Sequence, residues 1–269
     1  QSFPQNGIYV PNSGGSLTGG IYVKGDSAVD ISVDNNNNAV YAVTQGATTK
    51  TMTIDRAGQQ TTIVTSGGGP AETYAGIPDG MDDAGTLLYV EGSITGLKGT
   101  VQADTELTVA GSNDIVVTNH LRYTNYTPAV GNPGEAGYMP PNADNTTNLL
   151  GLVSWNGNVR VGTSAPNDVN IHGTVLAKNG ILQVDDYNDT GRGPRGTATL
   201  LGGVITNNYG AFGLFSGATG QQLSGYGRNF AYDERMQIGN APPYFPTLDT
   251  FVAFTNDIAD KLIWQEGGN

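Results

Sequence analysis

Residues 149–184, with the sequence LLGLVSWNGNVRVGTSAPNDVNIHGTVLAKNGILQV, decide the expected fold. Apolar runs of about four residues alternate in this stretch with turns rich in Gly and Asn, and the same rhythm extends back to Leu87. Short strands between tight corners are typical of a parallel β-solenoid, in which each coil stacks on the next. A β-sandwich would have a similar composition but longer strands, so the pattern favours the solenoid.

The composition excludes a helical protein. Of the 269 residues, 40 are Gly, 25 Asn and 30 Thr, while charged residues make up only 13%. Gly and Asn supply turns and Thr favours strands, whereas solvated helix faces need Glu, Lys and Arg. The chain has no cysteine, which excludes a disulfide framework, a thiolate metal site and a cysteine nucleophile.

The expected all-β fold divides into three segments. Residues 1–86 hold N-terminal strands and runs that alternate apolar with polar residues, which predict an antiparallel β-meander with one wet face. Residues 87–240 hold the solenoid coils, interrupted by a long loop rich in Pro, Gly and Asn at 127–148. Residues 241–269 contain several aromatic side chains and predict a C-terminal cap, which an open-ended solenoid needs to block strand addition.

The net charge of −12 argues against general binding of polyanions. The charge is uneven, because residues 1–150 hold 5 Lys and Arg against 14 Asp and Glu, whereas residues 151–269 hold 7 against 10. We therefore expect any surface that faces an anion to lie in the second half. No apolar run is long enough to cross a bilayer, so we expect no membrane contact from this segment.

An ordered series of short motifs extends over nearly the whole chain, at residues 3–4, 7–10, 20–26, 114–120, 149–153, 169–177, 225–226, 232–235 and 242–246. This series resembles large minor-pilin-like surface proteins of the Thermus–Deinococcus type. The resemblance implies a non-enzymatic, extracellular β-solenoid protein on a type IV pilus, linked to competence and DNA uptake. Such proteins begin with a prepilin leader and a hydrophobic helix that contacts other pilin subunits. Neither is present in residues 1–269, so we expect these residues to be the surface-exposed portion.

The two histidines, His120 and His172, each stand beside an apolar run. A local hydrogen bond is the expected role of each imidazole, because no His spacing in the chain suits a metal site. The sequence therefore predicts no metal and no cofactor. Calcium at Asp79, Asp82 and Asp83 stays an open alternative, although these residues lack the order of an EF-hand loop.

Asp185, Asp186 and Asp189 stand close to Arg192 and Arg195 in the sequence. Such a group can supply the acid, the base and the anion stabiliser of an enzyme that cleaves acidic polysaccharides. The same residues are also ordinary turn formers, whose side chains cap backbone amides. We expect the structural role and no enzyme.

The segment 191–196, Gly-Arg-Gly-Pro-Arg-Gly, is the most distinctive local motif. Arg192 and Arg195 stand among Gly and Pro with little side-chain cover, so their guanidinium groups can reach phosphates. Arg160 and Arg228 would join them if neighbouring coils stack in register. These four arginines are the candidate DNA-binding residues.

Tyrosines near these arginines offer faces on which single-stranded bases can stack; the candidates are Tyr187, Tyr209 and Tyr226. The alternative is that each arginine pairs with a local carboxylate, as Arg235 would with Asp233 or Glu234.

The sequence thus predicts the surface domain of a pilus-associated minor pilin that captures extracellular DNA through sequence-independent contacts between Arg and phosphate. Two alternatives remain open. One is a carbohydrate-binding adhesin that uses an uncharged, Tyr-rich face, and the other is an acidic-polysaccharide lyase or hydrolase built on the Asp185 group.

Overall fold

The computed structural model describes residues 7–79, 85–131, 134–142, 147–238 and 240–245. Within these ranges the chain forms β-strands and one short 3₁₀ helix, η1 (Glu234–Ile238), and no α-helix. An all-β protein with a large, mostly parallel sheet is therefore confirmed. The strands are β1 (Gly7–Tyr9), β2 (Asn12–Ser13), β3 (Ser16–Leu17), β4 (Ile21–Lys24), β5 (Ser27–Val33), β6 (Ala39–Gln45), β7 (Thr48–Asp55), β8 (Gln60–Thr65), β9 (Glu72–Ala75), β10 (Thr86–Glu91), β11 (Ile94–Val101), β12 (Glu106–Gly111), β13 (Ile115–Tyr123), β14 (Leu149–Ser154), β15 (Val159–Val161), β16 (Asn170–His172), β17 (Thr174–Val184), β18 (Pro194–Leu201), β19 (Val204–Tyr209), β20 (Gly213–Phe215) and β21 (Gln222–Ala231).

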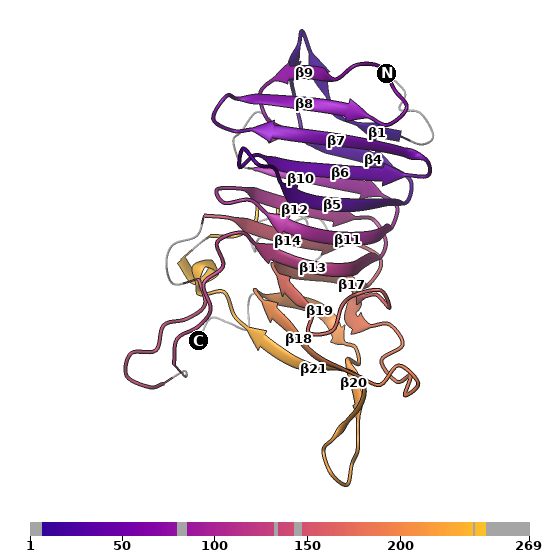
Figure 1. The fold of residues 1–269 in the computed structure, drawn as a ribbon, viewed down its shortest axis with the longest axis vertical. Helices are drawn as coiled ribbons and strands as arrows, with labels where there is room; N and C mark the ends of the chain where they lie inside the picture. Colours follow the sequence, from indigo (N-terminus) through magenta and orange to yellow (C-terminus); the bar gives the residue numbers. More distant parts are fainter. Residues whose placement is uncertain (1–6, 80–84, 132–133, 143–146, 239, 246–269) are drawn as a thin grey trace, which may run out of the picture.

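The parallel strands stack along the long axis of the molecule (Figure 1). A first ladder runs through β4, β10, β12, β14 and the first residues of β17 and β19. Side chains of one type align along it, because parallel strands in register place equivalent residues side by side. One aligned row, buried except for its half-buried last member, is Ile21, Leu88, Val109, Leu152, Val175 and Val204.

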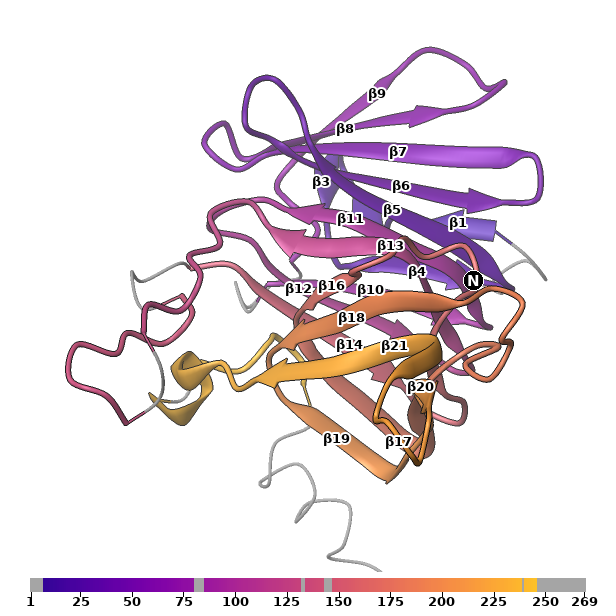
Figure 2. The same ribbon diagram turned by 60° about the horizontal axis from the view of Figure 1, so that its bottom comes forward.

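Two further ladders arise because the chain bends within its longer strands. The second ladder joins the first residues of β11 and β13 to β15 and the last residues of β17. The third ladder joins the last residues of β11 and β13 to β16, β18 and β21, while β5 pairs with residues 94–99 of β11 and so borders both the second and the third ladder. Figure 2 shows β18 and β21 of this third ladder on another side of the stack from β17 and β19.

The strands before residue 87 include both types of pairing. From β5 to β9 each strand pairs antiparallel with the next, so the predicted meander is confirmed. β4 and β5 also pair in parallel with β10 and β11. Residues 21–24 (Ile-Tyr-Val-Lys) lie in register beside residues 88–91 (Leu-Tyr-Val-Glu), which explains the similarity of the two segments.

The predicted loop at 127–148 lies between β13 and β14, and its described residues contain no strand, only an isolated bridge between Val130 and Met139. The predicted C-terminal cap lies mostly outside the described residues. Its described part, residues 241–245, packs on the outer side of the first ladder, where Phe245 contacts Val153 and Leu176. Residues 241–245 therefore lie along the side of the stack, whereas the sequence predicted a cap at an open strand edge.

Candidate functional site

Acidic residues are distributed unevenly over the strands. None of the strands from β13 to β21 contains Asp or Glu, whereas β5, β7, β9, β10 and β12 each contain one. The described acidic residues between β13 and β21, such as Asp168 and Asp185, lie in the connections between strands. The negative net charge of the whole chain therefore does not describe the local charge of the strands from β13 to β21.

In the third ladder, β13, β16, β18 and β21 pair in succession, and none of these four strands contains Asp or Glu. Its outward residues alternate with buried ones such as Leu121, Ile171 and Leu200. Asp168, in the loop before β16, borders this surface and accepts a hydrogen bond from the backbone N–H of Thr197 at 2.9 Å. We call the outward set the third-ladder surface; it consists of His120, Arg122, Asn170, Thr197, Thr199 and Asn229.

Arg192 and Arg195 come together at the edge of this surface where β18 begins. Both guanidinium groups donate hydrogen bonds to the backbone carbonyl of Thr163, and Arg195 also donates to the carbonyl of Ala165. Arg195 lies 4.8 Å from the centre of the Tyr226 ring. Within the described residues neither arginine forms an ion pair with a carboxylate, and Arg192 is exposed. Backbone carbonyls thus hold two positive charges side by side.

Arg160 and Arg228 do not join this pair. Arg160, on the second ladder, forms ion pairs with Asp114 at 3.1 Å and Asp185 at 3.0 Å, so its charge is already balanced. Arg228 stands opposite Ala198 in β18, lies over the Phe212 ring and donates to the carbonyl of Gly210 at 2.9 Å. Arg228 is exposed, although its register partner Ala198 is buried.

The three tyrosines expected near the arginines differ in exposure. Tyr226 is fully buried beneath Arg195 and donates its hydroxyl to the carbonyl of Pro166 at 2.8 Å, so no base can stack on it. Burial also raises the pKa of Tyr226. Tyr187 is half-buried and Tyr209 is exposed.

The Asp185 group serves the structure. Asp185 pairs with Arg160, and the carboxylate of Asp189 accepts the backbone N–H of Gly191 at 2.9 Å, as expected for a turn residue. Asp186 adopts a positive φ of 51°, which is typical of Asp in a tight turn. The described ranges contain no group of three or more acidic, His or Cys residues arranged to hold a metal ion. Asp82 and Asp83, two of the three calcium candidates, lie outside the described residues.

Both histidines accept a backbone hydrogen bond, but from a neighbouring strand rather than from a residue close in sequence, and the two bonds are reciprocal. Nδ1 of His120 on β13 accepts the backbone N–H of Asn170 on β16 at 3.0 Å. Nδ1 of His172 on β16 accepts the backbone N–H of Tyr123 on β13 at 3.1 Å. Burial and, to a lesser extent, the nearby Arg122 lower the pKa of both imidazoles, that of His172 to about 4.

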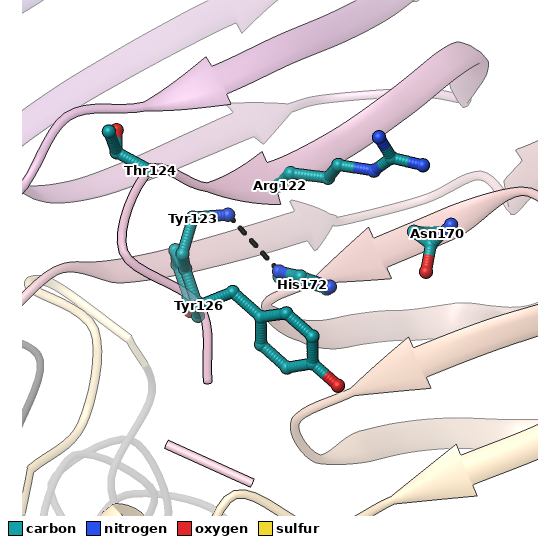
Figure 3. Close-up of a pocket in the computed structure, with 6 residues that line it drawn as sticks. All are labelled: Arg122, Tyr123, Thr124, Tyr126, Asn170 and His172. Carbon is teal, nitrogen blue, oxygen red and sulfur yellow. Dashed lines mark hydrogen bonds between the residues drawn. The ribbon is translucent and has the colours of Figure 1, made fainter. Parts of the chain in front are cut away.

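Arg122 and Tyr126 are site residues that the sequence argument missed. Together with Asn170 and His172 they line an open hollow of about 310 Å³ at the end of β13 (Figure 3). The only sequence signal was the alternation in residues 115–123, which places His120 and Arg122 on the same side of the strand as each other. The partner strand that completes the hollow begins at Asn170, too far along the chain for any local pattern to indicate.

Arg195 and Arg122 mark the two ends of the third-ladder surface. Leu121 lies in register with Ile171, and Ile171 with Leu200. Arg122 is therefore level with Leu201, six residues beyond Arg195, or roughly 20 Å along the strands. Of the two carboxylates considered for Arg235, Asp233 forms the buried ion pair, at 2.6 Å.

The fold and this surface define an all-β protein with a mostly parallel sheet, one side of which, from β13 to β21, carries arginines and no Asp or Glu within its strands. No family model, curated protein or solved structure matches the chain. Among the described residues, no helix has the length and apolar character needed to cross a membrane.

Proposed function

We propose that this chain is the extracellular β-solenoid portion of a type IV pilus-associated minor pilin, and that its third-ladder surface captures DNA during DNA uptake. The three parallel ladders would be the sides of successive coils, and the antiparallel meander an insertion at one end of the stack. Other pilin subunits would be its assembly partners. The activity is binding, without a chemical step.

One observation carries this proposal: the arginines at both ends of the third-ladder surface are not paired with carboxylates. Arg192 and Arg195 at one end and Arg122 at the other have no ion-pair partner among the described residues. The outward residues between them are His, Asn and Thr, which can donate hydrogen bonds to phosphate oxygens. The acidic remainder of the chain would repel DNA and so favour one orientation of contact.

A salt titration of DNA binding tests the proposal. Each phosphate contact that is lost should reduce the slope of log affinity against log salt by about 0.7 for single strands and about 0.9 for duplex DNA. The variant Arg192→Ala/Arg195→Ala should therefore show a slope smaller by up to roughly 1.4 to 1.8. The matched control is Lys50→Ala/Lys178→Ala, which removes the same charge from β7 and β17, outside the third ladder.

The proposal fails if the wild-type chain binds no DNA at low salt. The assignment to Arg192 and Arg195 fails if their removal leaves the slope unchanged, or changes it no more than the lysine control does.

A row of tyrosines favours a second candidate, carbohydrate binding. Tyr9, Tyr22 and Tyr89 occupy neighbouring positions on the outer side of the first ladder, with ring centres 6.0 Å apart in each adjacent pair. Such a row offers flat apolar surface to sugar rings. Glycan binding that is insensitive to salt and is lost in Tyr89→Ala would support this candidate. We propose no enzymatic function, because Asp185 is ion-paired and Asp189 caps a turn.

A further inference from the structure

The hollow at the end of β13 is richer in hydrogen-bond donors than in acceptors. Within the described residues, the exposed guanidinium of Arg122 has no carboxylate partner and no hydrogen bond, so its donors remain available. Figure 3 shows Arg122 and Tyr126 on either side of His172, with Asn170 beyond it. The side chains therefore surround a common space.

The proton position on His172 follows from its hydrogen bond. Its Nδ1 accepts a backbone N–H from Tyr123, which can only donate, so in the neutral ring Nε2 carries the proton. His172 is thus fixed as a donor on the side away from Tyr123, where Asn170 lies (Figure 3). The side-chain amide of Asn170 donates to the carbonyl of Asp168 at 2.9 Å, which leaves its oxygen as one acceptor toward the hollow.

The walls of the hollow are aromatic. The ring centre of Tyr126 lies 4.3 Å from that of His172, and that of Tyr123 lies 5.5 Å from the same imidazole. Flat walls suit a planar ring, and the excess of donors suits a ligand rich in acceptors. A neutral sugar presents several O–H donors, for which the hollow has few acceptors. A phosphate attached to a base presents mostly acceptors.

The size of the hollow limits what can enter it. A volume of about 310 Å³ lies at the lower end of the range for small-ligand sites, roughly 300 to 1,000 Å³. That volume suits one ring with its attached phosphate and excludes a base pair within a duplex. A base would have to be unpaired to reach Tyr126 and His172.

We propose that this hollow binds one unpaired nucleotide, with its phosphate on Arg122 and its base between Tyr126 and Asn170. The inference rests on the proposed DNA-binding function and adds to it a preference for single-stranded DNA at this end of the third-ladder surface. Arg192 and Arg195, at the other end, contact phosphates of either form of DNA.

The test compares binding of three small probes and two DNA forms by the whole chain. The small probes are thymidine 5′-monophosphate, inorganic phosphate and galacturonate, measured by calorimetry. The DNA forms are a labelled oligothymidine and a labelled hairpin duplex, measured by fluorescence anisotropy. The variants are Arg122→Ala, Arg122→Lys and Tyr126→Ala, each with its thermal midpoint recorded, and Arg192→Ala/Arg195→Ala serves as the control.

The expected result is selective. Arg122→Ala should weaken binding of the nucleotide and of oligothymidine by roughly tenfold or more, since a hydrogen bond to a charged group is lost. Tyr126→Ala should weaken both by roughly fivefold or more, through loss of stacking. Binding of the duplex should change by less than about twofold in either variant, because a paired base does not enter the hollow. Arg122→Lys, which retains the charge, should recover part of the loss, and the control should weaken both DNA forms alike.

Four results would overturn the inference. Equal losses of single-stranded and duplex binding in Arg122→Ala would do so while leaving the DNA-binding function intact. Inorganic phosphate binding as tightly as the nucleotide would reduce the hollow to an anion site. Galacturonate binding in place of the nucleotide would assign the hollow to acidic glycans. Absence of binding to every probe and every DNA would remove both proposals, whereas nucleotide binding through Arg122 without DNA binding would remove only the DNA-binding function.

Discussion

His120 and His172 accept backbone N–H groups where β13 and β16 meet, a role that carbonyl oxygens have in an ordinary strand pair. The two strands share a single pair in register, Leu121 with Ile171, and the imidazoles accept the backbone N–H groups on either side of it. A protonated ring has no acceptor nitrogen, so each bond requires a neutral imidazole. The two imidazoles thus add hydrogen bonds between β13 and β16, where the backbones pair in register at only one position.

Stability should fall as His172 becomes protonated. Its pKa drops from 6.5 in the free side chain to about 4 in the fold, through burial and then the nearby Arg122 and His120, while Asp233 opposes the shift. A lowered histidine pKa means that the unfolded chain binds the proton first. The contribution of the neutral His172 imidazole to the free energy of unfolding is therefore complete above about pH 6.5. The protein loses roughly 3 kcal/mol of stability as the pH falls toward 4.

Urea unfolding of wild type and of His172→Gln, each at pH 7 and at pH 4, measures this contribution. The wild type should lose more stability between the two pH values than the variant, whereas His120→Gln should retain most of the wild-type dependence. Identical pH dependence in wild type and His172→Gln would contradict the role assigned to this imidazole.

At the scale of elements, tight corners allow the strands to stack. Gly173 and Gly202 stand at the same corner in neighbouring turns of the chain, just before the first ladder, with φ of 152° and 150°. A Cβ at Gly202 would lie 2.1 Å from the carbonyl oxygen of Gly173. Only glycine permits both this backbone conformation and this approach.

Gly202→Ala should destabilise the fold by roughly 2 to 5 kcal/mol, because it combines backbone strain with a clash against a fixed carbonyl. The control is Gly217→Ala, since no atom lies within 4 Å of a Cβ at that position. Its effect should stay below about 1 kcal/mol. Equal free energies of unfolding for the two variants would refute the account of the corner.

The sequence predicts the side on which a residue lies better than it predicts its neighbours. Alternation in 30–64 indicated the meander, and glycine-bounded apolar runs indicated short strands. Arg228 was predicted to join Arg192 and Arg195, but it lies over Phe212 on the last strand, a position that depends on pairing with β18 and that alternation alone cannot reveal. The hollow was missed for the same reason, since Arg122 and His172 meet only when β13 and β16 become neighbours.

At the scale of the whole molecule, the residues behind the net charge of −12 are distributed unevenly over the strands. Acidic strand residues lie in the first half of the stack, and the strands from β13 onward carry none. Charge on a surface acts over about one Debye length, roughly 8 to 10 Å at moderate salt, so the local surface decides what binds there. An acidic protein can therefore offer a DNA-binding face.

The most direct test of this central claim adds a carboxylate to the proposed face. Thr199 lies in the middle of the third-ladder surface, and Thr53 lies on the outer side of the meander strand β7 with similar partial exposure. Thr199→Glu and Thr53→Glu change the net charge equally, so their DNA affinities at low salt can be compared without correction. The account predicts that Thr199→Glu weakens binding roughly tenfold or more while Thr53→Glu changes it less than about twofold. Equal effects of the two substitutions, or a larger effect of Thr53→Glu, would contradict it.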